Sequence, residues 1–310
     1  MFVCPAKSFD NVTGNFPIGF MIWDTNKKVK FEQINADVYD KDGNFIAVKS
    51  FYAYDDSQYI NDWIKPFRAK KDDKAVIGKF PFMSNDFQQQ SIIQINSPDM
   101  IYNKAAGQFL INMSNLPVTA IYFAVRKIIP ATWLNDRDQF LYPNDGWKTD
   151  EEFQNDCLAY TLFSNNIQSK YGVNHWIPFT ENEVDARDKF SSHFMKSFLN
   201  GKLIHNGYSN LFEQEEDKFC IKRDFSTEAK CVFDAGRQLW SYYHAQPDVY
   251  VNASLYDIRE YFQGRDSKGK MYNKSEDETY NELLGNLRMA LKTLAKKIEP
   301  KVYVYGFLKE

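Results

Sequence analysis

The amino-acid sequence predicts a mixed α and β (α+β) chain, with strands and hairpins in roughly the first 110 residues and a mostly helical remainder. Short apolar runs between turn residues dominate the beginning, whereas apolar residues recur at helical spacing after Pro117. The content of 44% hydrophobic and 25% charged residues is that of a globular protein. We divide the chain into a strand-rich segment (1–115), a mixed and helical segment (116–205) and a helical segment (206–310).

Two patterns near the beginning predict strands. Residues 16–23, FPIGFMIW, form a nearly all-apolar run that is typical of a strand buried on both faces. Residues 36–40 and 44–54 flank Lys41-Asp42-Gly43, where Gly43 can adopt the positive φ that a tight hairpin requires. Further expected elements are a short amphipathic helix over 56–67 and strands over 92–95 and 109–112.

The later part of the chain carries helix signals. An apolar stripe starts at Pro117 and ends before Pro130, which predicts a helix that delivers the following loop to the surface. Thr180 to Glu183 has the form of a capping box, and we expect its helix to continue to Asn200, with Gly201 just past the end. Other helices are expected over 149–163, 225–244, 254–263 and 275–300, the last one closed by Pro300.

Bulk properties limit the function classes. With a net charge of −3 and a pI near 5.9, the chain cannot bind DNA through overall charge, so any DNA contact must be local. The four cysteines form no CxxC pair and no secreted-type framework, which indicates reduced core thiols. No apolar run of membrane-spanning length and no leader sequence is present, so we expect a soluble, cytoplasmic protein without membrane contacts.

Motifs of common active sites are missing from the sequence. The four histidines never occur as HxH or HExxH, so we expect no metal site. No GxSxG elbow, P-loop or GxGxxG run occurs, and the acidic pairs lie in charged runs such as 213–217. We therefore expect that the chain by itself binds no cofactor.

One motif comes near to a catalytic pattern. Enzymes that methylate the exocyclic amine of adenine use Asn/Asp-Pro-Pro-Tyr/Phe, where the polar groups accept the protons of the amine and the aromatic ring stacks on the extruded base. Residues 9–18, FDNVTGNFPI, offer Asn15, Phe16 and Pro17 at the first three positions. Because the second position is Phe and the fourth is Ile18, these residues are only weak catalytic candidates.

Residues 132–147, TWLNDRDQFLYPNDGW, combine aromatic side chains with Asn, Asp and Arg and contain little aliphatic material. Such a run is poor core material, but it has the side chains that stack on bases and pair with their edges. It makes nucleic acid the first partner to consider. A structural alternative stays open, in which the Trp residues anchor the loop to the core and Arg137 pairs with a neighbouring Asp.

Several blocks resemble the C-terminal part of adenine-specific DNA methyltransferases from bacterial restriction-modification systems. The blocks lie from about residue 14 to the end: GNFPIGFMIWDT, AIYFAVRKIIPATWLNDRDQFLYPNDGW, NDCLAYTLF, NHWIPFTENEV, SLYDIREYFQGR and ETYNELLGNLRMALKTLAKKIEPKVYVYGF. In that family the cofactor-binding Gly-rich turn and the catalytic motif lie upstream on a Rossmann-like sheet. The resemblance implies that residues 16–25 form one of the last strands of such a sheet, and that the remainder faces the DNA.

The resemblance further implies that this chain supplies DNA binding and target recognition, while a catalytic half or subunit supplies S-adenosylmethionine and methyl transfer. Candidate contacts with double-stranded DNA from the matching blocks are Arg126, Lys127 and Arg137 for phosphates or guanine, Asn135 and Gln139 for adenine, and Trp133 and Trp147 for stacking. Arg265, Lys268 and Lys270 are phosphate candidates on charge alone. Two alternatives remain: a self-sufficient methyltransferase with an altered catalytic loop, and a structural partner whose strand 16–23 pairs with another sheet.

Overall fold

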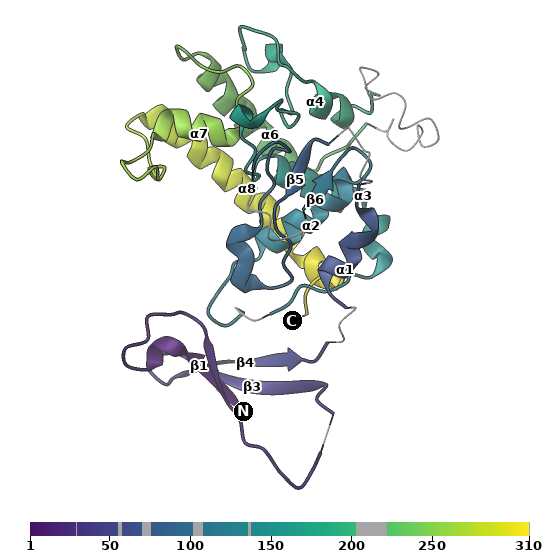
Figure 1. The fold of residues 1–310 in the computed structure, drawn as a ribbon, viewed down its shortest axis with the longest axis vertical. Helices are drawn as coiled ribbons and strands as arrows, with labels where there is room; N and C mark the ends of the chain where they lie inside the picture. Colours follow the sequence, from purple (N-terminus) through teal and green to yellow (C-terminus); the bar gives the residue numbers. More distant parts are fainter. Residues whose placement is uncertain are drawn as a thin grey trace.

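The computed structural model describes residues 1–28, 30–54, 58–69, 76–101, 108–135, 138–202 and 222–309. A small four-stranded sheet lies at one end of the molecule, and a larger, mostly helical body lies beyond it (Figure 1). The mixed α and β class with a mostly helical C-terminal part is therefore confirmed. Arg137, Asp136 and residues 213–217, which the sequence analysis discusses, lie outside the described residues.

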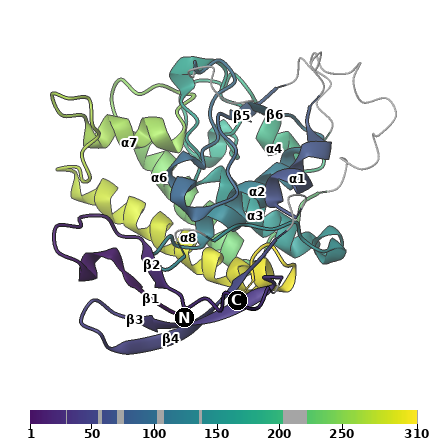
Figure 2. The same cartoon turned by 60° about the horizontal axis from the view of Figure 1, so that its bottom comes forward.

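The N-terminal sheet has the strand order β2-β1-β3-β4 and mixed directions. Its strands are β1 (Phe2–Pro5), β2 (Pro17–Phe20), β3 (Gln33–Tyr39) and β4 (Phe45–Tyr52). Strands β1 and β3 are parallel, while β1–β2 and β3–β4 are antiparallel (Figure 2). The predicted hairpin is confirmed as β3–β4, and Gly43 has the expected positive φ of 85°.

This sheet has a very small core. Val3, Ala36 and Val38 form its core cluster, and Phe51, Trp133 and Leu134 pack partly against them. The expectation of a strand buried on both faces over 16–23 is wrong, because β2 is an edge strand that ends at Phe20. Past that strand, Ile22 is 102% exposed and Trp23 is 76% exposed. No described element covers these side chains.

The body contains a two-stranded sheet and most of the helices. Its strands are β5 (Gly78–Phe80) and β6 (Phe109–Ile111). Its helices are α1 (Ile60–Ile64), α2 (Leu116–Ile128), α3 (Glu151–Leu162), α4 (Phe194–Leu199), α6 (Thr227–His244), α7 (Leu255–Gln263) and α8 (Glu278–Val304). Short 3-10 turns cover Ala6–Ser8 beside the N-terminal sheet and, in the body, Lys65–Phe67, Phe87–Ile92, Asp145–Lys148, Ser169–Tyr171 and Glu181–Glu183.

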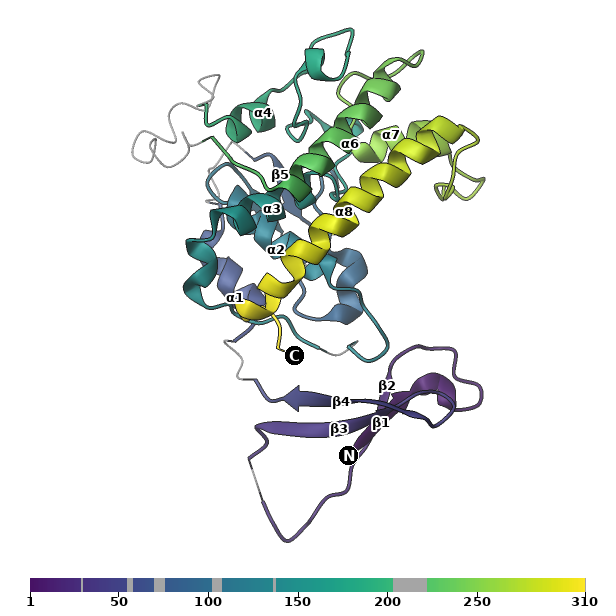
Figure 3. The ribbon, with the colours of Figure 1, turned by 180° about the vertical axis from the view of Figure 1, so that it is seen from behind.

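A single apolar core holds the body together. It runs from Ile60 to Leu308 and so crosses both expected boundaries, at 115 and at 205. The long helix α8 crosses the back of the body and packs against α6, α3 and α2 (Figure 3). Burial of this one core by segments far apart in the sequence makes the body one packing unit.

Most predicted helices are present, but the one expected over 180–200 is not. The capping box at Thr180 and Glu183 forms, yet it starts a single 3-10 turn, and α4 begins only at Phe194. The Glu181 carboxylate accepts a hydrogen bond from the Phe190 backbone N–H at 2.8 Å and thereby folds the intervening chain into a loop. Gly201, with φ of 64°, lies just past the end of α4 as expected.

Three smaller expectations are also wrong. Pro300 lies inside α8, which continues to Val304 instead of ending at the proline. Residues 92–95 form no strand, because the chain there leaves a 3-10 turn that ends at Ile92. Cys231 is exposed, whereas Cys4 and Cys157 are buried free thiols as expected.

Candidate nucleic-acid interface

The loop that the sequence predicts to read bases follows α2 of the body and packs against the N-terminal sheet. Trp133 is half-buried and packs against the small core of the sheet. The Asn135 side chain accepts a hydrogen bond from the Thr132 backbone N–H at 2.6 Å and donates one to the Pro130 carbonyl at 3.0 Å. Asp138 pairs with Lys49 of β4 at 2.6 Å. Trp133 and the Lys49–Asp138 pair therefore hold the loop against the sheet, while Asn135 fixes the conformation of the loop itself.

Two of the candidate DNA contacts are core residues. Arg126 is 1% exposed, and its guanidinium lies 3.6 Å from the Tyr122 ring centroid and donates to the Tyr122 and Ser84 carbonyl oxygens. Burial lowers the pKa of Arg126. Trp147 is 6% exposed and meets the Trp63 ring edge to face at 5.3 Å. Neither side chain can reach DNA in this structure.

Lys127 and Gln139, by contrast, are only half-buried. Burial lowers the pKa of the Lys127 ammonium, with a further contribution from the neighbouring charge of Arg126. Gln139 forms an isolated antiparallel bridge with Asp86. Both residues therefore keep part of their surface available for a ligand.

The turn after α7 presents two lysines to solvent. The Asp266 carboxylate accepts hydrogen bonds from the Lys268 and Lys270 backbone N–H groups at 2.9 and 2.8 Å, and Gly269 supplies the positive φ of 78° that the turn needs. Arg265 is held by Glu260 at 2.9 Å, and this pairing raises its pKa. Lys268 and Lys270 are therefore the exposed charges of this turn, while Arg265 is already paired.

The structure does not bring the candidate residues to one place. The turn after α7 lies at the far side of the body, whereas the loop around Trp133 lies next to the N-terminal sheet (Figures 1 and 3). The weak catalytic candidates Asn15 and Phe16 are exposed just before β2, and Pro17 is its first residue. None of these three lines the cavity that β1 and the β3–β4 hairpin form.

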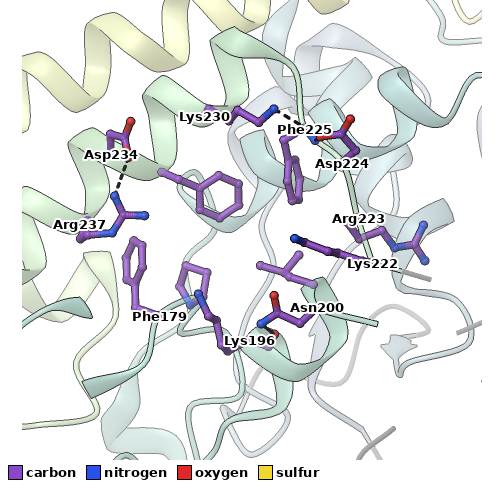
Figure 4. Close-up of a pocket in the computed structure, with 13 residues that line it drawn as sticks. Phe179, Lys196, Asn200, Lys222, Arg223, Asp224, Phe225, Lys230, Asp234 and Arg237 are labelled. Atoms are coloured by element: carbon purple, nitrogen blue, oxygen red, sulfur yellow. Dashed lines mark hydrogen bonds and ion pairs between the residues drawn. The ribbon is translucent and has the colours of Figure 1, made fainter. Parts of the chain in front are cut away.

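A pocket of about 390 Å³ between α4 and α6 brings together residues that sequence reasoning missed (Figure 4). Its walls come from Pro178–Phe179, α4, the segment 222–225 and the first half of α6. Five basic residues and only two acidic ones line it. The basic residues are Lys196, Lys222, Arg223, Lys230 and Arg237, and the acidic ones are Asp224 and Asp234.

Backbone contacts fix the segment that forms one wall of this pocket. The Arg223 N–H donates to the Leu199 carbonyl at 2.9 Å, and the Asn155 side chain donates to the Asp224 carbonyl at 2.8 Å. Ser226 then caps α6 by accepting from the Ala229 N–H, and its hydroxyl donates to the buried carboxylate of Asp156. The wall is thus tied to α3, α4 and α6 together.

Some of the basic side chains that line the pocket form ion pairs, and others do not. Lys230 pairs with Asp224 at 3.3 Å and Arg237 pairs with Asp234 at 2.5 Å (Figure 4). Lys196 pairs at 2.6 Å with Glu183, which lies outside the pocket lining. Lys222 makes no ion pair within the described part of the chain.

Arg223 is a second cation that makes no ion pair with a described residue, although the charge of Glu151 acts on it. Its guanidinium lies 5.0 Å from the Phe198 ring centroid, and its buried Nε atom has no hydrogen-bond partner there. Burial lowers the pKa of Arg223 because the charged form is partly removed from water. An anion bound beside this segment would offset that cost.

Aromatic rings complete the pocket. Phe225 and Phe233 are half-buried, and their ring centroids lie 4.8 Å apart with the planes at 63°. Phe179, which is buried, also lines the pocket. The run Lys222-Arg223-Asp224-Phe225, directly before the cap of α6, is the sequence signal that points here, since it places basic and aromatic side chains next to each other.

Two other classes of site find no support among the described residues. No three His, Cys, Asp or Glu side chains there are arranged to hold a metal ion. None of the helices described is both long enough and apolar enough to cross a membrane. Comparisons with family models, curated proteins and solved structures gave no match for the chain.

Proposed function

We propose that this chain is the DNA-binding and target-recognition part of an S-adenosylmethionine-dependent, adenine-specific DNA methyltransferase of a restriction-modification system. A catalytic half, on another chain or segment, would carry the methyl donor and the transfer step. The observation that carries the proposal is the pocket between α4 and α6, where basic residues outnumber acidic ones by five to two in a chain of net charge −3. The sequence resemblance gives the choice of enzyme class.

DNA binding would start from cations that make no ion pair with a described residue. Lys222 and Arg223 at the pocket, and Lys268 and Lys270 on the turn after α7, can neutralise phosphates without first breaking an ion pair with a described residue. The half-buried residues Lys127, Trp133, Asn135 and Gln139 remain candidate contacts beside the N-terminal sheet. The core residues Arg126 and Trp147 leave the proposed interface because of their burial.

The N-terminal sheet would contact the catalytic half. Its edge strand β2 has a free side, and the side chains that follow it, Met21, Ile22 and Trp23, are exposed. An open strand edge next to large apolar side chains is a surface on which another sheet can add. In this proposal the four strands complete a Rossmann-like sheet whose remaining strands belong to the catalytic half.

Fluorescence anisotropy with an unmethylated duplex of about three helical turns tests DNA binding. We expect binding that weakens as the salt concentration rises. In the double variant Lys222→Ala, Arg223→Ala, the slope of the logarithm of the association constant against the logarithm of the salt concentration should be shallower by about two, since each neutralised phosphate contributes about 0.9. Lys41→Ala, on the β3–β4 hairpin, is a control that should leave the slope unchanged. Absence of duplex binding at low salt would contradict the proposal.

A second measurement separates this proposal from a self-sufficient enzyme with Asn15, Phe16 and Pro17 as its catalytic loop. Calorimetry with S-adenosylmethionine and transfer of labelled methyl groups to DNA are both expected to be negative for this chain. If heat of binding and labelled DNA are found, and Asn15→Ala abolishes the labelling, the chain holds its own donor site and the division of tasks is wrong.

A further inference from the structure

We propose that the pocket between α4 and α6 binds a single unstacked nucleotide of the DNA, with its base against Phe225 and its phosphate at Lys222. The inference rests on the proposed function, because it names what the same site takes from bound DNA. The pocket volume of about 390 Å³ is in the range of small-molecule sites. A base that is still paired within the helix cannot enter such a recess, so the occupant must be unpaired or extruded.

Two aromatic rings of the pocket, Phe225 and Phe233, can bind a base by stacking. The Phe225 and Phe233 rings meet edge to face, with their planes at 63° and their centroids 4.8 Å apart, so each ring holds the other in place. Both rings are half-buried, so each keeps a fixed orientation and part of its surface open. Stacking on an aromatic face tolerates any base, which gives binding but no sequence reading.

The free charge lies next to these rings. In Figure 4 the Lys222 side chain extends into the middle of the pocket, close to Phe225, while the Lys230 and Arg237 side chains turn toward Asp224 and Asp234. Lys222 and Phe225 also belong to the same short segment, which is tied to α3 and α4. A nucleotide stacked on Phe225 would therefore have its phosphate beside the ammonium group of Lys222.

Asn200 adds a hydrogen-bonding group at the pocket wall. Its Nδ2 donates to the Lys196 carbonyl at 2.9 Å, which fixes the amide and leaves Oδ1 directed toward the cavity (Figure 4). An amide oxygen accepts hydrogen bonds, so it can pair with the exocyclic amine of adenine, whereas thymine presents its O4 acceptor at the same edge. We therefore infer that the pocket prefers adenine over thymine.

The experiment compares four duplexes of one length by anisotropy: fully paired, with one unpaired adenine, with one unpaired thymine, and with one unpaired abasic residue. The wild-type chain should bind the unpaired adenine about tenfold more tightly than the paired duplex, since stacking of one base has an effect of this order. Thymine should bind less tightly than adenine, and the abasic residue should give no gain over the paired duplex. These comparisons need no variant.

Variants assign the gain to this pocket. Phe225→Leu keeps an apolar side chain but removes the ring, so the gain for unpaired adenine over the paired duplex, both measured with this variant, should fall to about twofold or less. Asn200→Ala should abolish the difference between adenine and thymine. Phe45→Leu, which changes an exposed phenylalanine on β4, is the matched control and should behave like wild type.

Three results would overturn the inference. Equal affinity for paired and unpaired duplexes, or an equal gain from the abasic residue, would refute nucleotide capture and leave duplex binding intact. An unchanged gain in folded Phe225→Leu would place capture elsewhere. Absence of binding to every duplex would overturn both this inference and the proposed function.

Discussion

The N-terminal sheet and the helical body differ sharply in how they bury apolar side chains. The core cluster of the sheet consists of three residues, Val3, Ala36 and Val38, whereas the body has one core that runs from Ile60 to Leu308. Of the twenty large apolar side chains that are exposed in the described chain, twelve lie before residue 49. Most of these exposed side chains therefore belong to the N-terminal sheet and the segments between its strands, although this is the smaller part.

The two regions depend on different contacts for their stability. A sheet gains stability by packing at least one face against another layer. Here the loop around Trp133 packs against the sheet, and the Lys49–Asp138 ion pair joins the two. The helices of the body bury their apolar side chains against one another, so the body does not depend on a covering loop. We expect the body to determine the main unfolding transition and the sheet to depend on what covers it.

The largest expected effect comes from the core of the body. Leu287 is fully buried on α8. Leu287→Ala should lower the free energy of unfolding by about 2–5 kcal/mol, because the deletion leaves a cavity that close-packed neighbours fill only partly. Urea unfolding followed by far-ultraviolet circular dichroism at the helix signal measures this loss.

Val38→Ala in the sheet is the matched variant for that comparison. It also removes buried apolar atoms, but from the three-residue core of the sheet. We expect the urea midpoint of the unfolding transition seen in the helix signal to equal that of wild type. If Val38→Ala lowers this midpoint as much as Leu287→Ala does, sheet and body unfold as one cooperative unit, and the contrast between them fails.

The next effect concerns pH and again separates the body from the sheet. His244, on α6, is 2% exposed, and burial lowers its pKa to about 4 from an ordinary value of 6.5. The unfolded chain thus takes up a proton near pH 6.5, whereas the folded chain does so only near pH 4. Stability is therefore lost as the pH falls from 6.5 to 4, by up to about 3 kcal/mol from this group.

His244→Gln should flatten the dependence of the unfolding free energy on pH between 4 and 6.5, as measured by urea unfolding at a series of pH values. Other groups titrate in both proteins, so the difference between variant and wild type is the quantity that matters. Above pH 7 this difference should be constant. An equal slope in variant and wild type below pH 6.5 would refute a neutral buried imidazole.

Sequence reasoning predicted the elements with local signals and missed what tertiary packing decides. The β3–β4 hairpin and the helix after Pro117 follow from a turn glycine and an apolar stripe, each contained in one segment. The capping box at Thr180 indicates where a helical turn begins but not how long the helix continues. The sequence therefore predicts a helix where the structure has a loop. Strand β1 is too short to give a pattern of its own.

The candidate site was harder to predict for a related reason. Arg126 lies on an apolar helix, and the sequence alone suggests that its charge is available to a ligand. In the structure the Tyr122 ring and the Ser84 carbonyl contact the guanidinium, which the sequence does not show. The pocket between α4 and α6 combines residues from Pro178 to Arg237, which packing alone brings together. Of that pocket, only the Lys222 to Phe225 run is visible in the sequence.

Two glycines in the helices of the body give a smaller pair of opposite effects. A Cβ at Gly236 of α6 would lie 2.3 Å from a ring carbon of Phe163, which is itself fully packed, whereas a Cβ at Gly285 of α8 would meet nothing within 4 Å. Gly236→Ala should therefore cost about 1–3 kcal/mol through overpacking. Gly285→Ala should stabilise by about 0.5–1 kcal/mol, because alanine is the better helix former.

Thermal unfolding of these two glycine variants measures both effects in one experiment. Each change adds the same methyl group to a helix, so propensity alone would stabilise both. A stabilised Gly236→Ala would mean that α6 and Phe163 can move apart, and the close packing that distinguishes the body from the sheet would then be less tight than we infer.

The smallest effect on stability is expected at the uncovered end of the sheet. Ile22→Ser with Trp23→Ser removes two large side chains that contact solvent, so the free energy of unfolding should change by less than about 0.5 kcal/mol. The same double variant should reduce self-association of the chain at high concentration, as seen by analytical ultracentrifugation, because it removes exposed apolar area. If instead it lowers the unfolding midpoint by several degrees, these side chains are already buried in solution, and the sheet is covered by the chain's own residues and not left open for a partner.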